Sequence, residues 1–75
     1  MALNSKLNEV PVVRFDYEDH SVITVDFGPG ADPIVDVVDG TAILIVEDTQ
    51  NELDLPDGEV EVFNRNGVIT FEIRQ

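Results

Sequence analysis

Apolar and polar residues alternate in short runs along this chain, and no stretch shows the three-to-four-residue apolar repeat of an amphipathic helix. The alternation is clearest in 21–27 (SVITVDF) and 67–74 (GVITFEIR). Successive side chains of a strand point to opposite faces, so one face is expected in a core and the other in water. Glycine, proline, aspartate and asparagine separate the runs, which predicts an all-β sandwich of about six or seven strands.

Three strands allow a prediction of the buried face. The inward sets are Val13, Phe15 and Tyr17; Ile23, Val25 and Phe27; and Ile69, Phe71 and Ile73. The run 41–46 (TAILIV) is apolar on both faces, so it is either buried on both sides or presents one face to a partner. We favour a central strand covered by neighbouring loops. The inward face of Thr41 to Val46 stays open, because a one-residue shift of register exchanges the two faces.

Glycine and proline mark the connections between strands. The segment 28–33 (GPGADP) predicts a loop that crosses between sheets, and Asp39-Gly40 predicts a tight hairpin. The segment 64–67 (NRNG) suits a type I turn closed by Gly67 in the left-handed region. Residues 1–9 are predicted to form a flexible N-terminal arm, followed by a single β-sandwich domain over residues 10–75.

Length and cysteine content limit the class of protein. The chain has 75 residues, enough for one small domain, and it lacks cysteine, which excludes disulfides and thiolate metal sites. The start resembles no signal peptide, and the longest apolar run is far shorter than the roughly 20 residues that span a bilayer. We expect a soluble, cytoplasmic protein.

Charge is the strongest compositional feature. Sixteen acidic residues face four basic ones, for a net charge of −12. Such a surface repels nucleic-acid phosphates and anionic lipids, so neither nucleic acid nor membrane is an expected partner. Two interpretations remain: a docking surface for a basic partner, or adaptation to high salt, which screens the repulsion. We favour halophilic adaptation, because the acids are spread from Glu9 to Glu72.

The chain offers few groups for catalysis or metal binding. His20 is the one usual base and stands beside Ser21, but neighbours on a strand point to opposite faces. The acidic clusters 16–19 (DYED) and 46–54 (VEDTQNELD) could supply oxygen ligands to calcium, yet neither has the EF-hand spacing. We expect solvated turns there, no catalytic residue, no cofactor and no metal, and therefore no enzyme.

Three segments in this order resemble the small heat-shock protein family and its α-crystallin domain. They are 22–45 (VITVDFGPGADPIVDVVDGTAILI), 53–60 (LDLPDGEV) and 66–73 (NGVITFEI). The matching positions are Asp26, Phe27, Gly30, Asp32, Ile34, Val37, Asp39, Gly40, Leu53, Leu55, Pro56, Asn66, Gly67, Val68 and Ile69. The resemblance implies an immunoglobulin-like β-sandwich and ATP-independent, chaperone-like binding of unfolded or extended protein segments. The alternative is a co-chaperone-like interaction module that binds one folded partner without catalysis.

The resemblance also implies a place for peptide binding. In the family, an apolar groove lies between the strands that match Ile34 to Val38 and Glu59 to Phe63, and an extended client adds along such an edge. The candidate groove residues here are Val35, Val37, Val60, Val62 and Phe63. Core positions are the alternative for Val60 and Val62. Phe63 breaks their alternation, so it either faces outward or marks a bulge. Glu59 and Glu61 put charge where the family tends to place neutral residues.

Two departures from the family affect assembly. Only a short segment separates Ile45 from Leu53, where the family carries a long insertion with a strand exchanged between partners. The chain stops at Gln75, without the family's Ile-x-Ile tail. We therefore expect a monomer or weak dimer rather than a large oligomer, with protein clients or one protein partner.

Overall fold

The described residues are arranged as strands joined by turns. The computed structural model describes residues 2–7 and 10–75, with side chains described from Val10 onward. The strands are β1 (Ala2–Leu7), β2 (Val10–Asp16), β3 (His20–Asp26), β4 (Ile34–Val38), β5 (Thr41–Val46), β6 (Thr49–Asp54), β7 (Glu59–Arg65) and β8 (Val68–Arg74). The prediction of an all-β fold is confirmed.

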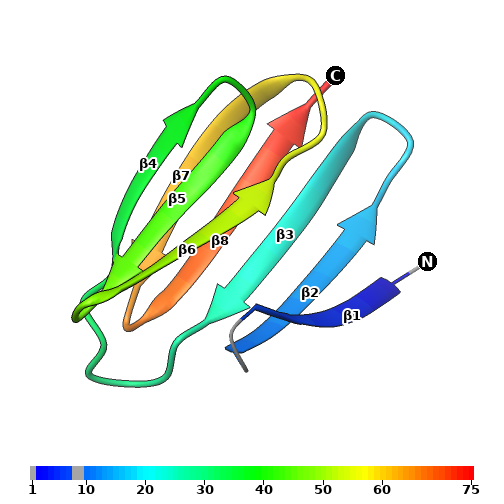
Figure 1. Cartoon of the computed structure of the whole chain (residues 1–75). Helices are drawn as coiled ribbons and strands as arrows, with labels where there is room; N and C mark the ends of the chain where they lie inside the picture. The colour runs from blue at the N-terminus through cyan, green and yellow to red at the C-terminus, as the bar shows by residue number, and fades with distance from the viewer. Residues whose placement is uncertain (1, 8–9) are drawn as a thin grey trace.

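The strands form two antiparallel sheets that pack face to face as a sandwich (Figure 1). The large sheet has the strand order β1-β2-β3-β8-β7, and the small sheet has the order β4-β5-β6. The small sheet lies over β7 and β8, whereas β2 and β1 extend beyond it on the other side (Figure 1). The two sheets therefore differ in width, and part of the large sheet has no opposing layer. Within the described residues there is no helix that could cross a membrane.

The core forms where the two sheets overlap. Its buried apolar residues are Val12, Ile23, Val25, Ala42, Leu44, Leu55, Ile69, Phe71 and Ile73. The predicted inward faces of β3 and β8 are confirmed, and Phe27, just after β3, packs against the core half-buried. The open question on β5 is also answered, because Ala42 and Leu44 face inward. Ile43 and Ile45 on the other side are half-buried, so the expected cover of loops is incomplete.

The predicted inward face of β2 is wrong. Val12 is buried, while Phe15 and Tyr17 are 41% and 56% exposed. Val12 pairs with Val25 of β3, and residues directly opposite each other share a face of the sheet. The more apolar side of β2 is thus turned outward. No sheet faces β2 along most of its length (Figure 1), so alternation alone did not decide which side is buried.

Two strands, β1 and β6, lie in segments for which no strand was predicted. The predicted arm at residues 1–9 includes Ala2–Leu7, whose backbone pairs with β2 as edge strand β1; residues 1, 8 and 9 lie outside the described residues. The polar segment of β6 was expected to be a solvated turn. It pairs with β5, and its inward positions, Asn51 and Leu53, lie opposite Leu44 and Ala42.

The predicted hairpin at Asp39-Gly40 is confirmed, with both residues at positive φ (50° and 77°) between β4 and β5. The turn type predicted for 64–67 is wrong. Asn66 and Gly67 both have positive φ (56° and 82°) and form a two-residue loop between β7 and β8. That loop has the twist of a primed turn, which suits the right-handed twist of the paired strands better than a type I turn.

The loop at 28–33 crosses from β3 in the large sheet to β4 in the small sheet, as predicted. It is held against the β7–β8 hairpin, because the amide of Phe27 donates to the carbonyl of Gly67 at 2.9 Å. A side chain at Gly67 would collide with the carbonyl of Gly28. Gly67 therefore provides both a left-handed turn and the close approach of two backbones.

Candidate functional site

Two edge strands, β4 of the small sheet and β7 of the large sheet, carry most of the exposed large apolar side chains. The exposed fractions are 65% for Ile34, 47% for Val38, 40% for Val62 and 50% for Phe63. Each strand pairs on one side only, with β5 or β8 respectively. An edge strand presents unpaired backbone N–H and C=O groups that another chain can bind. Apolar contact area and free backbone groups thus occur together on these two strands.

The two edges lie on the same side of the sandwich (Figure 1). The side-chain amide of Asn64, on β7, donates to the carbonyl of Pro33 at 3.2 Å, just before β4 begins. This hydrogen bond joins the far end of β7 to the buried residue that precedes β4. The two strands expected to border a groove therefore come close together in space, although many residues separate them in the sequence.

The five candidate groove residues fall into two groups. Val35, Val37 and Val60 are half-buried and pack against the core. Val62 and Phe63 are exposed on β7. Val35, Val37 and Val60 are thus core-facing positions, and Val62 and Phe63 offer most of the accessible apolar surface among the five. The structure does not bring all five into one open groove.

Phe63 faces outward, and β7 has no bulge. The pairing of β7 with β8 runs without interruption from Glu59 opposite Arg74 to Arg65 opposite Val68. Phe63 lies opposite Thr70, while Val62 lies opposite the buried Phe71. Phe63 therefore points to the face opposite Val62 simply because neighbouring residues of a strand face opposite sides. An open hollow of about 850 Å³ follows this strand, with Val62, Phe63, Val68 and Thr70 among its lining residues.

The acidic residues of β7 lie away from the valines. Glu59 and Glu61 alternate with Val60 and Val62, so they face the outer side of the large sheet. Glu61 lies opposite Glu72, whose carboxylate pairs with Arg74 at 2.8 Å. The hydrogen bond from Glu72, then its charge and that of Glu61, raise the pKa of the Arg74 guanidinium. The charge that departs from the family's pattern thus does not point at the β4 side.

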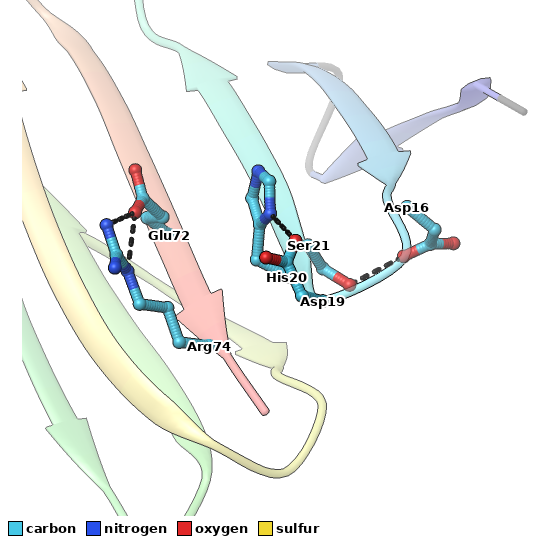
Figure 2. Close-up of polar contacts among 6 residues, drawn as sticks. All are labelled: Asp16, Asp19, His20, Ser21, Glu72 and Arg74. Atoms are coloured by element: carbon cyan, nitrogen blue, oxygen red, sulfur yellow. Dashed lines mark hydrogen bonds and ion pairs between the residues drawn. The ribbon is translucent and has the colours of Figure 1, made fainter.

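His20 and Ser21 do not form a catalytic pair. The Nδ1 atom of His20 lies 2.6 Å from a carboxylate oxygen of Asp19 (Figure 2). The imidazole ring stacks on Tyr17 at a centroid distance of 4.6 Å. The hydroxyl of Ser21 is buried and donates to Asp16 at 2.8 Å instead (Figure 2). The hydrogen bond to His20 lowers the pKa of Asp19. The pair is split by strand alternation, as its adjacent positions predict.

The acidic clusters do not converge on one point in the structure. Among the described residues, no group of three or more histidine, cysteine, aspartate or glutamate side chains could hold a metal ion. Asp16 accepts hydrogen bonds from Arg14 and Ser21, which lower its pKa, and Asp19 pairs with His20. In the second cluster, Glu52 and Asp54 belong to strand β6.

A second hollow was not predicted from the sequence. It has a volume of about 650 Å³ and opens between the crossing loop and the β5–β6 turn. Its walls include Val10, Phe27, Asp32, Val46 and Glu47. These residues come from three separate segments, and no local pattern marks them as neighbours. The glycine and proline of the crossing loop are the one sequence feature that points to this end of the sandwich.

Comparison with known proteins places the chain in a family without assigning an activity. No curated protein and no solved structure matches it. One family matches over residues 1–73, nearly the whole chain, and its description states that its function is unknown. By its sequence, therefore, the protein belongs to the family of unknown function DUF7127.

Proposed function

We propose that this protein binds extended or unfolded protein segments without ATP, as the small heat-shock proteins that its sequence resembles do. One observation carries the proposal: the two unpaired edges β4 and β7 lie on one side of the sandwich and bear exposed apolar side chains. The proposal includes an immunoglobulin-like, α-crystallin-like sandwich and a cytoplasmic location, which the absence of cysteine fits.

A client segment would add to β7 as a further antiparallel or parallel strand. Backbone hydrogen bonds along the seven residues of β7 would supply affinity that does not depend on client sequence. Apolar client side chains on one face would contact Val62, and those on the other face would contact Phe63. Binding of this kind suits unfolded chains, because a folded protein rarely offers a free extended segment.

The negative charge of β7 favours client segments that carry basic residues. Glu59 and Glu61 lie on the same face as Phe63 and are exposed. A client strand with lysine or arginine beside its apolar residues complements this face, and an acidic client is repelled. High salt would weaken this preference while leaving the backbone hydrogen bonds in place.

The test is suppression of client aggregation, followed by light scattering. Chemically reduced insulin is a suitable client, since the protein has no cysteine for the reductant to act on. We expect the wild type in molar excess to suppress the scattering, and Val62→Thr with Phe63→Thr to lose most of that effect. Threonine keeps the β-propensity while removing apolar area.

Phe15→Thr is the matched control. Phe15 is exposed to a similar degree, 41%, but it lies on β2, which pairs on both sides. We expect it to protect the client as well as the wild type does. Failure of the wild type at tenfold excess would refute the proposal. Recovery of a single folded partner from the host at native salt would favour the interaction module instead.

A further inference from the structure

The outward side of the small sheet is a second exposed surface with a regular arrangement of side chains. We call it the small-sheet outer face. In order across β4, β5 and β6, its rows are Ile34, Ile45 and Gln50; Asp36, Ile43 and Glu52; and Val38, Thr41 and Asp54. These positions alternate with Ala42 and Leu44, which are buried in the core. The rows therefore point away from the large sheet.

The small-sheet outer face combines apolar and acidic side chains in a fixed pattern. Ile34 and Val38 are exposed and Ile43 and Ile45 are half-buried. In the middle row, carboxylates from the two flanking strands lie on either side of Ile43. Neighbouring strands are about 4.8 Å apart, so these carboxylates are roughly 10 Å from each other at the backbone. A partner that complements this row needs two basic groups with an aliphatic side chain between them.

Charge distinguishes this face from the rest of the molecule. The four basic residues belong to strands of the large sheet: Lys6 to β1, Arg14 to β2, Arg65 to β7 and Arg74 to β8. Segment 34–54, which forms the small sheet, contains neither lysine, arginine nor histidine. The ion pairs of the described side chains, including those of Arg14 with Asp16 and Arg74 with Glu72, lie on or beside the large sheet. The acids of the small sheet thus face no basic residue of their own sheet.

We propose that the small-sheet outer face docks a basic amphipathic helix of another protein. Residues seven apart in a helix are about 10.5 Å apart along its axis, close to the separation of the two acidic strands. A helix with lysine or arginine at such positions, and an aliphatic side chain between them, would pair with Asp36 and Glu52 and cover Ile43. This surface shares Ile34 and Val38 of β4 with the edge described above, but it would bind through side chains and not through backbone groups. The proposal holds whether or not the edges bind clients.

A second copy of this chain is a poor occupant of the face. Each chain carries a net charge of −12, and two copies of the face would bring carboxylates against carboxylates. The carboxylates that would repel a second copy would attract a basic partner. Because the apolar area at the centre is small, attraction between charges would set both the choice of partner and the salt dependence of binding.

The probe is a synthetic helical peptide of about two to three heptads, with lysines seven residues apart and leucines between them. Its control has glutamate in place of each lysine. The full chain, labelled with ¹⁵N, is titrated at the lowest salt at which circular dichroism shows it folded. We expect amide shifts centred on Ile43, Ile45 and Glu52, and no binding of the glutamate peptide.

Matched variants separate the face from net charge. Asp36→Asn with Glu52→Gln should weaken binding about fivefold or more. Glu18→Gln with Asp57→Asn removes the same charge from exposed turns and should weaken it less than twofold. Ile43→Thr should weaken it about tenfold, with circular dichroism confirming that each variant is folded.

Four outcomes would overturn the proposal. They are absence of binding by the lysine peptide, equal losses in the two double charge variants, shifts centred on β7 instead of β5, and a sedimenting dimer that Ile43→Thr dissociates. The last would identify a second copy as the occupant. Loss of insulin protection with this binding intact, or the reverse, distinguishes this surface from the edge-strand function.

Discussion

Strands β2 and β8 have similar alternating sequences but different surroundings. Every second residue of β8 is buried, at Ile69, Phe71 and Ile73, under the small sheet. In β2 only Val12 is buried, and Arg14 and Asp16 follow on the same side. The small sheet covers β8 and does not reach most of β2 (Figure 1). Alternation identifies two faces of a strand, and the opposing sheet decides which of them becomes core.

The two sheets also differ in how their charges are balanced. Two acids of the large sheet have basic partners: Arg14 lies 2.9 Å from Asp16, and Arg74 lies 2.8 Å from Glu72. All charged residues of the small sheet are acidic. Ion pairs therefore reduce part of the repulsion between carboxylates in the large sheet. In the small sheet, that repulsion is reduced only by dissolved salt or by a bound partner. The same acidic composition thus has different consequences in the two layers.

The largest expected difference is between truncating Phe71, which faces the small sheet, and truncating Phe15, which faces away from it. Phe71→Ala should lower the free energy of unfolding by about 3–5 kcal/mol, because it leaves a cavity at a fully buried position. Phe15→Ala should cost less than about 1 kcal/mol, since its side chain is already 41% exposed. Urea unfolding at one fixed salt concentration measures both.

Phe71→Leu provides a measurable step if the alanine variant does not fold, and it should cost about 1–1.5 kcal/mol. Similar losses at Phe71 and Phe15 would mean that the outer face of β2 is covered. That result would contradict the outward direction of Phe15.

The two hairpins offer the next comparison. Gly40 and Gly67 have similar φ, 77° and 82°, but a Cβ at Gly40 would meet open space, whereas one at Gly67 would meet the Gly28 carbonyl. Gly40→Ala should cost about 1–2 kcal/mol from the left-handed conformation alone. Gly67→Ala should cost at least about 1 kcal/mol more, because the backbone must also shift. Urea unfolding again gives the values, and equal costs would show that the crossing loop is not held at this hairpin.

A smaller effect should separate the charges of the two sheets. Asp36→Asn with Glu52→Gln should raise the thermal midpoint by about 2 °C in dilute buffer, since it removes repulsion. The gain should fade above about 1 M potassium chloride, where the screening length is only about 3 Å. Glu72→Gln should give no gain, because it also removes the partner of Arg74. Thermal melts across a salt series test this, and equal gains would contradict the difference in charge balance.

The smallest effect is a pKa change at the margin of the large sheet. Hydrogen bonds from Arg14 and then Ser21 hold the pKa of Asp16 below its usual 3.8. Stability from this ionised carboxylate is therefore complete above pH 3.8 and is lost as pH falls through the lower folded value. Ser21→Ala should raise the pKa of Asp16 toward 3.8. NMR titration of the carboxyl carbons measures it, with Asp19, whose pKa is lowered by His20, as an internal control that should not move.

The local features of this fold can be predicted from short stretches of the sequence. Alternation predicted β3 and β8 with the correct inward faces, Asp39-Gly40 predicted the β4–β5 hairpin, and the glycines and prolines at 28–33 predicted the crossing between sheets. Each follows from the conformational preferences of neighbouring residues, so a short window of sequence is sufficient. The net charge also follows from the sequence, because counting charged residues requires no structure.

The packing of the two sheets sets which faces and edges meet. It turned Phe15 and Tyr17 outward, made a strand of the polar segment Thr49–Asp54, and brought β4 beside β7 through Asn64 and Pro33. It also aligned Asp36, Ile43 and Glu52 across the small sheet. All of these have one cause. Burial and strand pairing depend on residues far apart in the chain, so the pattern within one strand does not show which strand or sheet it will contact.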